Sequence, residues 1–257
     1  MGRKGVKADV RVFPGGDAML DAAVEVVIRE AAASIAGRGR FTVVLAGGST
    51  PQGLYQRLAH APHRDRIDWT RVHLFWGDER CVPPGDPASN YRMAREALID
   101  HVPVPPAQVH RIHGEDEPGA EAVRYDALLR TALNVAGSSR AGAFDLVLLG
   151  LGTDGHTASL FPGMTAPRES ARWVVAEYID TARGWRITLT PVPLNAAHAV
   201  VFLVAGADKA PALAAVVEGP VLPDALPAQR VATGATAVRW MVDRAAASRL
   251  TQIAPDR

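Results

Sequence analysis

Apolar residues recur along the chain in two patterns that alternate with each other. Over residues 17–36 they return at three- and four-residue spacing with charged residues off the stripe, which predicts an amphipathic helix closed by Gly37 and Gly39. Segments such as 41–46 and 144–149 are short and almost wholly apolar, which predicts strands buried on both faces. The chain therefore reads as strands and helices in alternation.

The two patterns together predict an α/β fold. Strands that alternate with helices and are themselves apolar indicate a mainly parallel sheet with helices on both faces and right-handed crossovers. We expect one domain over residues 1–257, with an ordered core at about 8–250, in which the segments after Pro162 can build a small subregion. The expected strands are 10–13, 41–46, 72–76, 144–149, 173–176, 186–190, 200–205 and 238–242, and the expected helices are 17–36, 51–60, 90–99, 117–133, 209–217 and 243–250.

Composition and charge narrow the class of protein. Of the 257 residues, 48% are hydrophobic and 21% are charged, which is typical of a globular protein with a large core. The formal net charge of +1 gives no field that would favour nucleic acid or a membrane surface, and no apolar run approaches the length of a membrane span. With Cys81 as the single cysteine and no secretory apolar region at the start, we expect a cytoplasmic protein. Its oligomeric state stays open between a monomer and a weak dimer.

The stretch FDLVLLGLGTDGHTASLFPG, residues 144–163, carries the first candidate chemistry. An apolar strand breaks into a glycine-rich loop, and ligands of open parallel sheets bind just beyond the carboxyl ends of the strands. A histidine with its ordinary pKa of about 6.5 can accept a proton at neutral pH, so His156 is a candidate base, and Asp154 can orient its ring. The alternative is a turn followed by a helix cap at Thr157 or Ser159.

A second candidate is the glycine-rich turn between strand 41–46 and helix 51–60. Unpaired backbone N–H groups at a helix N-terminus suit a phosphate. The turn lacks the lysine and spacing of a Walker loop and the third glycine of a dinucleotide fingerprint. The alternative is an ordinary turn with Thr50 as the N-cap and a proline at the first helical position. The residues concerned are Gly47, Gly48, Ser49 and Thr50.

A charged run and three isolated polar residues complete the candidate set. Asp78, Glu79 and Arg80 follow strand 72–76, where Arg80 can hold a phosphate through two parallel hydrogen bonds. The alternative is a surface salt-bridge cluster. Asn90 reads equally well as a helix cap.

Two cations stand apart from that run. Arg186 lies in RITLT, and Lys209 opens a helix, where the positive end of the helix dipole disfavours a cation unless an anion is bound nearby. A solvated surface lysine is the alternative. No metal is expected, because His60 and His63 have no partner carboxylate at ligand spacing and the other histidines are scattered.

Six blocks, taken in order, resemble one family, the 6-phosphogluconolactonases. They are LAGGSTP, LFWGDERCVPP, SNYRMAREAL, FDLVLLGLGTDGHTASLFPG, RITLTP with LNAAHAVVFLVAG, and DKAPAL. The resemblance implies a NagB/RpiA-like, modified Rossmann-type α/β fold. It also implies a carboxylic ester hydrolase that converts 6-phospho-D-glucono-1,5-lactone to 6-phospho-D-gluconate, the second step of the oxidative pentose phosphate pathway, without a cofactor.

The resemblance also implies roles for the candidate residues. His156 would be the general base, supported by Asp154, and Asn90 and Arg186 would line the sugar site. Asp78 would position Arg80 or its loop. The phosphate would be held by Gly47, Gly48, Ser49 and Thr50 together with Arg80 and Lys209. The chain departs from the family at residues 180–185, DTARGW, where many members approach the arginine through prolines, and this leaves the placement of Arg186 open.

Two rival functions remain at this stage. An isomerase or deaminase acting on glucosamine 6-phosphate would share the fold and use Asp78 as a base toward carbon. A non-catalytic sugar-phosphate sensor would need a DNA-binding helix-turn-helix, for which the expected elements leave no room.

Overall fold

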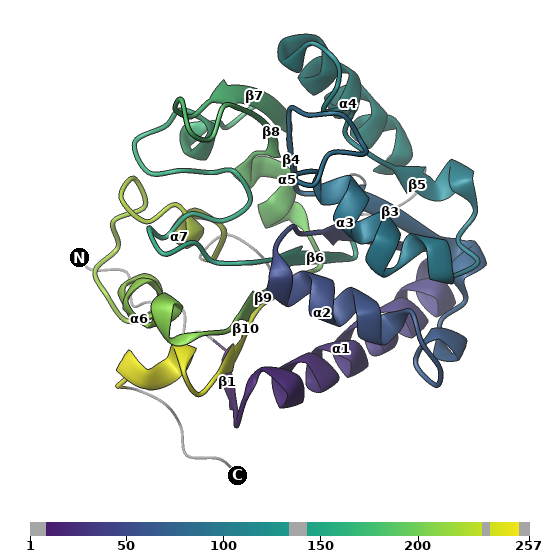
Figure 1. Ribbon diagram of the computed structural model, residues 1–257, viewed down its shortest axis with the longest axis horizontal. Coiled ribbons are helices and arrows are strands. Elements are labelled where there is room, and N and C mark those ends of the chain that lie inside the picture. The colour runs from purple at the N-terminus through teal and green to yellow at the C-terminus, as the bar shows by residue number, and fades with distance from the viewer. Residues whose placement is uncertain (1–8, 134–142, 233–236, 252–257) are drawn as a thin grey trace.

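A seven-stranded parallel sheet forms the centre of the molecule (Figure 1). The computed structural model describes residues 9–133, 143–232 and 237–251, so position 8 and the segments 134–142 and 233–236 of the expected core lie outside the described residues. The strand order is β1-β10-β9-β6-β2-β3-β5, which confirms the predicted mainly parallel sheet. The strands are β1 (Asp9–Phe13), β2 (Phe41–Leu45), β3 (Val72–Trp76), β5 (Val109–His110), β6 (Leu146–Leu149), β9 (Ala199–Val204) and β10 (Val238–Asp243).

The apolar runs of the sequence occupy the middle of this sheet. Every residue of β2, β6 and β9 is buried, which requires cover on both faces. Figure 1 shows α1, α2 and α3 side by side as one layer of that cover. None of the described helices combines the length and apolar character needed to cross a membrane. The helices are α1 (Gly16–Arg38), α2 (Ser49–Leu58), α3 (Asn90–Ala97), α4 (Pro118–Leu133), α5 (Pro191–Ala196), α6 (Ala210–Val217) and α7 (Ala228–Ala232).

Most helix ends shift by one or two residues from the sequence prediction, and two differences have a clear physical cause. Gly37 lies inside α1, and only Gly39, with a φ of 76°, closes it by donating its N–H to the Ile35 carbonyl. The helix expected at 243–250 is wrong, because only a 3₁₀ turn forms there, at Ala246–Arg249. The Asp243 carboxylate accepts hydrogen bonds from the N–H groups of both Gly206 and Ala246, so it holds this segment in a tight turn against the neighbouring loop.

A second, antiparallel sheet of three strands lies beside the first. Its order is β4-β8-β7, with β4 at Asp78–Arg80, β7 at Val174–Tyr178 and β8 at Trp185–Leu189. The sequence placed the subregion after Pro162, and β7 and β8 do lie there, but β4 comes from the charged run after β3. Gly77 joins the two sheets, since its N–H donates to Leu45 of β2 and its carbonyl accepts from Leu189 of β8. Helix α4 packs on β7 and β8, as Figure 1 shows.

The strand order reverses between β2 and β6. From β2 the chain proceeds outward through β3 and β5, whereas from β6 it proceeds the other way through β9 and β10. Loops that leave β2 and β6 therefore diverge, and this opens a crevice at their carboxyl ends. The glycine-rich segments 47–48 and 150–152 directly follow these two strands.

Asp145, just before β6, fixes that central strand pair. Its Oδ2 accepts hydrogen bonds from the Thr42 N–H at 2.7 Å and the Thr42 hydroxyl at 2.8 Å. Its Oδ1 accepts from Arg38 Nε, at the end of α1, at 2.7 Å. A buried carboxylate thus joins the beginnings of both strands to the first helix.

We expect Asp145→Ala to lower the free energy of unfolding by about 2–4 kcal/mol, because it leaves the buried Thr42 N–H and the Arg38 guanidinium without their acceptor. Urea denaturation measures the change. Asp65→Ala, which removes an exposed ion pair with Arg64, serves as the control and should cost under about 1 kcal/mol. Equal effects from the two substitutions would contradict this account of the strand pair.

Candidate active site

A cavity of about 220 Å³ opens at the point where the strand order reverses. Its walls come from the segments that follow β2, β3, β6 and β9 and from the start of α3. Most of the residues predicted from the sequence meet in it, although they are far apart along the chain. The lining residues are Ala46, Gly47, Gly48, Asp78, Arg80, Asn90, Gly150, Leu151, Gly152, His156, Thr157, Ala158 and Lys209.

Asp154 and His156 form a hydrogen-bonded pair at the rim of this cavity. Asp154 Oδ1 lies 2.5 Å from the ring Nδ1 of His156 and also accepts the His156 backbone N–H at 3.1 Å. Burial works to raise the pKa of Asp154, but the hydrogen bonds from His156 outweigh it and hold that pKa below its usual value. Because the carboxylate engages Nδ1, the imidazole has Nε2 left for proton transfer.

The alternative interpretation of this loop, a turn leading into a capped helix, is wrong. No helix begins at Thr157 or Ser159 within the described residues. The Thr157 hydroxyl donates to the Gly150 carbonyl at 2.8 Å, and the Ser159 hydroxyl donates to Asp78 Oδ2 at 2.6 Å. Both side chains therefore hold the loop against the cavity wall.

Two glycines are needed because side chains approach them closely. A Cβ at Gly152 would overlap with the His156 ring and lie 2.7 Å from Asp154 Oδ1. A Cβ at Gly47 would overlap with the side-chain amide of Asn90. Real Cβ atoms do not make such contacts, so these glycines leave the space that the polar side chains fill.

Asp78 is buried in the cavity wall and held from both sides. One oxygen accepts from the Ser159 hydroxyl, and the other lies 3.3 Å from Asn90 Nδ2, which also donates to the Asp78 carbonyl at 2.9 Å. Ser159 in turn donates its N–H to the Thr188 hydroxyl at 3.3 Å. The sequence analysis did not identify Ser159 and Thr188 as site residues. The only signal available was that each lies in a candidate motif, Ser159 in the stretch 144–163 and Thr188 in RITLT.

Glu79 connects the small sheet to α3. Its Oε1 accepts the N–H groups of Arg80 at 2.8 Å and Asn90 at 2.7 Å, and its Oε2 accepts the Tyr91 N–H at 2.8 Å. Burial raises the pKa of Glu79, and the backbone hydrogen bonds offset part of that rise. A carboxylate at a helix N-terminus satisfies N–H groups that the helix leaves free.

These contacts correct two alternative interpretations. Ser89 is the N-cap of α3, since its hydroxyl accepts the Arg92 N–H, whereas Asn90 is the first helical residue. Asp78, Glu79 and Arg80 do not form a surface salt-bridge cluster: the first two are buried, and none of the three forms an ion pair within the described residues.

Arg80 and Arg186 lie opposite each other in the β4–β8 pair, so they share one face of the small sheet. Across the described parts of the chain, neither has a carboxylate within ion-pair distance, and both donate to backbone carbonyls instead. Burial and the charge of Arg80 lower the pKa of Arg186. Like charges directly opposite each other destabilise a sheet, so a bound anion would relieve this arrangement.

The remaining predicted residues surround the same place. Lys209 ends a 3₁₀ turn before α6, lines the cavity, and has its Nζ 3.3 Å from Asp208 Oδ2. Gly48, with a φ of 98°, is the N-cap of α2, so the alternative of Thr50 as N-cap is wrong. Ser49 and Thr50 form the first turn of α2 and do not line the cavity.

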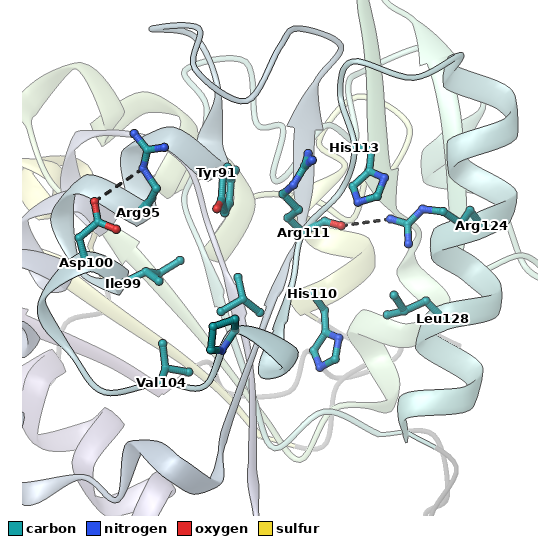
Figure 2. Close-up of a pocket in the computed structure, with 12 residues that line it drawn as sticks. Tyr91, Arg95, Ile99, Asp100, Val104, His110, Arg111, His113, Arg124 and Leu128 are labelled. Atoms are coloured by element: carbon teal, nitrogen blue, oxygen red, sulfur yellow. Dashed lines mark hydrogen bonds and ion pairs between the residues drawn. The ribbon is translucent and has the colours of Figure 1, made fainter.

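A second cavity, of about 440 Å³, lies near the edge strand β5 (Figure 2). Within the described residues, its arginines differ from those near the first cavity in having carboxylate neighbours: Arg111 lies 2.6 Å from Glu115, and Arg124 lies 2.5 Å from Glu121. Its third arginine, Arg95, lies 3.7 Å from Asp100. No residue predicted for the site lines this cavity, and its positive charge is already neutralised. The lining residues are Tyr91, Arg95, Ile99, Asp100, Val104, Pro106, Val109, His110, Arg111, His113, Arg124 and Leu128.

One group of metal-ligating side chains stands near that second cavity. Atoms of His113, Asp116 and Glu121 lie within 4.8 Å of one another. Both oxygens of Glu121 already accept hydrogen bonds from Arg124, so the carboxylate is engaged with a cation. This arrangement does not favour a second cation.

Comparison with known proteins gives one family. The sequence profile described as glucosamine-6-phosphate isomerases/6-phosphogluconolactonase matches residues 14–240. A 6-phosphogluconolactonase of Nostoc is 38% identical over 96% of this chain and 100% of its own length. The solved structure of 6-phosphogluconolactonase from Trypanosoma brucei has a TM-score of 0.83 at 28% identity, covering 95% of this chain and 99% of its own. A monomeric glucosamine-6-phosphate deaminase has a TM-score of 0.80 at 20% identity, covering 94% of this chain and 99% of its own, which shows the shared fold alone.

We expect Gly152→Ala to displace the His156 ring and to lower the free energy of unfolding by about 1–3 kcal/mol, because the new methyl group overpacks the loop. Imidazole ¹⁵N resonances and urea denaturation report the two effects. Gly150→Ala is the matched control, since a Cβ there meets nothing within 4 Å. Unchanged His156 resonances in Gly152→Ala would show that the ring does not depend on this glycine.

Proposed function

The chain belongs to the family of glucosamine-6-phosphate isomerases and 6-phosphogluconolactonases, and we propose that it hydrolyses 6-phospho-D-glucono-1,5-lactone to 6-phospho-D-gluconate. It is an enzyme whose curated relatives, matched over nearly the whole chain, are 6-phosphogluconolactonases. The reaction is the second step of the oxidative pentose phosphate pathway, and we place it in the cytoplasm. The observation that carries the proposal is one cavity with a hydrogen-bonded Asp–His pair at its rim. Beside it is a pair of arginines that have no carboxylate partner in the described parts of the chain.

The phosphate would be held by the cations of the small sheet and the glycine turn. Arg80 lines the cavity, and among the described residues its side chain donates only to the Ala88 carbonyl, while Arg186 adds charge from the adjacent strand. Gly47 and Gly48 precede the N-terminus of α2, where free N–H groups and the helix dipole favour an anion. Lys209 supplies charge from beyond β9. A dianion would offset the repulsion between these groups.

His156 would act as the general base on water. It takes a proton from the water whose oxygen attacks the lactone carbonyl carbon, while Asp154 holds Nδ1 and stabilises the imidazolium that forms. The tetrahedral intermediate then collapses with cleavage of the bond between that carbon and the ring oxygen, and the imidazolium returns its proton to the leaving oxygen. A positioned base contributes roughly 10²–10⁴ in rate, and oxyanion donors contribute a similar factor.

Asp78 distinguishes this reaction from that of the isomerase and deaminase rivals. A base toward carbon must direct a carboxylate oxygen at the substrate, whereas the two oxygens of Asp78 are directed at Ser159 and Asn90, one donor on each. We propose that Asp78 holds Asn90 and the loop that carries Ser159 in place. In deuterated water the lactonase should leave no deuterium on carbon after hydroxyl back-exchange, as mass spectrometry of the product would show. Deuterium retained on carbon would instead support the rival reaction.

The test of function uses freshly made 6-phosphogluconolactone, with acid release followed in a pH-stat and corrected for spontaneous hydrolysis. We expect the wild type to accelerate release, and His156→Asn to lower kcat by about 10²–10⁴-fold with the fold intact by circular dichroism. Asp78→Asn should cost less than His156→Asn, since it removes a positioning group. A folded His156→Asn variant with near-normal kcat would exclude this histidine as the base.

The proposed contact between Arg80 and the phosphate predicts that the effect of Arg80→Gln depends on whether the substrate carries a phosphate. We expect KM for the phosphorylated lactone to rise about 10–100-fold, because the substitution removes a charge-assisted hydrogen bond to the phosphate. KM for plain gluconolactone should change little. Lys209→Ala should act in the same direction. Steady-state kinetics on both lactones measure the effect, and Arg64→Gln, on the surface, is the control. A parallel loss on both substrates would mean that Arg80 does not hold the phosphate.

A further inference from the structure

The turn between β7 and β8 is the segment in which this chain departs from the proline-rich approach of the resembling family. Asp180 anchors it, because its Oδ1 accepts the N–H groups of Ala182 at 3.0 Å and Arg183 at 2.7 Å. Gly184, with a φ of 65°, donates its N–H to the Asp180 carbonyl at 2.7 Å. These contacts close a tight turn and fix the position of the Arg183 backbone.

The Arg183 side chain lies against the catalytic pair. Its Cζ is 4.9 Å from the centre of the Phe161 ring, and the His156 ring centre lies 4.3 Å from the same ring. Its Nη2 is 4.0 Å from Asp154 Oδ2, while Nη1 is held by Asp180 Oδ2 at 3.0 Å. One buried phenyl ring therefore supports both the imidazole and the guanidinium.

From this arrangement we propose that Arg183 is a positioning residue for the Asp154–His156 pair, an inference that rests on the proposed function of that pair. Asp154 Oδ1 is occupied by His156, whereas Oδ2 accepts no hydrogen bond within the described residues, and Arg183 is the cation beside it. The positive guanidinium attracts Oδ2 of Asp154 and so favours the orientation of the carboxylate in which Oδ1 faces the imidazole. It also covers Phe161, against which the imidazole packs.

Arg183 acts through this pair and not through the substrate. It does not line the cavity, and its guanidinium is committed to Asp180. Loss of the side chain should therefore lower kcat and leave KM for the lactone nearly unchanged. We expect a loss of about three- to tenfold, less than the roughly hundredfold that a misplacement of 1 Å can cost, because solvent screens the charge of a side chain that is about half exposed.

The test compares Arg183→Gln and Arg183→Lys with a matched control, Arg130→Gln. Arg130 also stacks on an aromatic ring, 4.6 Å from Trp173, and pairs with Asp126, but it lies on α4 away from the cavity; its side-chain exposure of 49% matches the 46% of Arg183. All three variants keep the backbone contacts of their segments. We expect kcat to fall in the order wild type, Arg183→Lys, Arg183→Gln, with Arg130→Gln at the wild-type value.

A readout without substrate separates this inference from the proposed function. Imidazole ¹⁵N resonances of His156, assigned by their loss in His156→Asn, should change in Arg183→Gln and not in Arg130→Gln. Unchanged resonances would overturn the inference whether or not the wild type hydrolyses the lactone. Wild-type kcat in Arg183→Gln, a rise in KM alone, or equal losses in the two glutamine variants would overturn it as well. An inactive wild type with shifted resonances would refute only the proposed function.

Discussion

The reversal of strand order between β2 and β6 is the constraint on which the rest of the structure depends. Two parallel strands that lead away from each other leave a crevice at their carboxyl ends, which no helix of the flanking layers can close. Both strands are buried at every position, so their register is set by core packing, and Asp145 ties their beginnings together. Because this strand pair is rigid, loops from distant parts of the chain meet at its carboxyl end with fixed geometry.

Buried carboxylates then connect the small sheet to α3 and to the loop after β6. Glu79 accepts N–H groups from β4 and from the first turn of α3, and Asp78 receives Ser159 from the loop after β6. Each carboxylate joins two separate segments of the chain. The cost of burying these groups is offset by several hydrogen bonds apiece, which explains why polar side chains can form the wall of the site.

The same small sheet carries an arrangement that stability alone does not explain. Arg80 and Arg186 face each other on neighbouring strands, and burial together with mutual repulsion works against the charge on Arg186. A sheet selected for stability would place opposite charges at this position. The unfavourable pair is the reason for proposing a phosphate site on the second sheet.

Local patterns in the sequence determined most of the strands and helices and the parallel sheet, because periodicity reports directly on backbone geometry and burial. The short elements β4, β5, α5 and α7 were not predicted. They also placed Asp154 beside His156, since two residues in one glycine loop meet without help from the fold. Tertiary structure alone decided that Arg80 opposes Arg186, that Ser159 holds Asp78, that Glu79 binds the start of α3, and that Arg183 stacks on Phe161. Each of these contacts joins segments distant in sequence, and its partner is set by strand register and sheet packing. The local spacing of residues does not specify which distant segment becomes the neighbour.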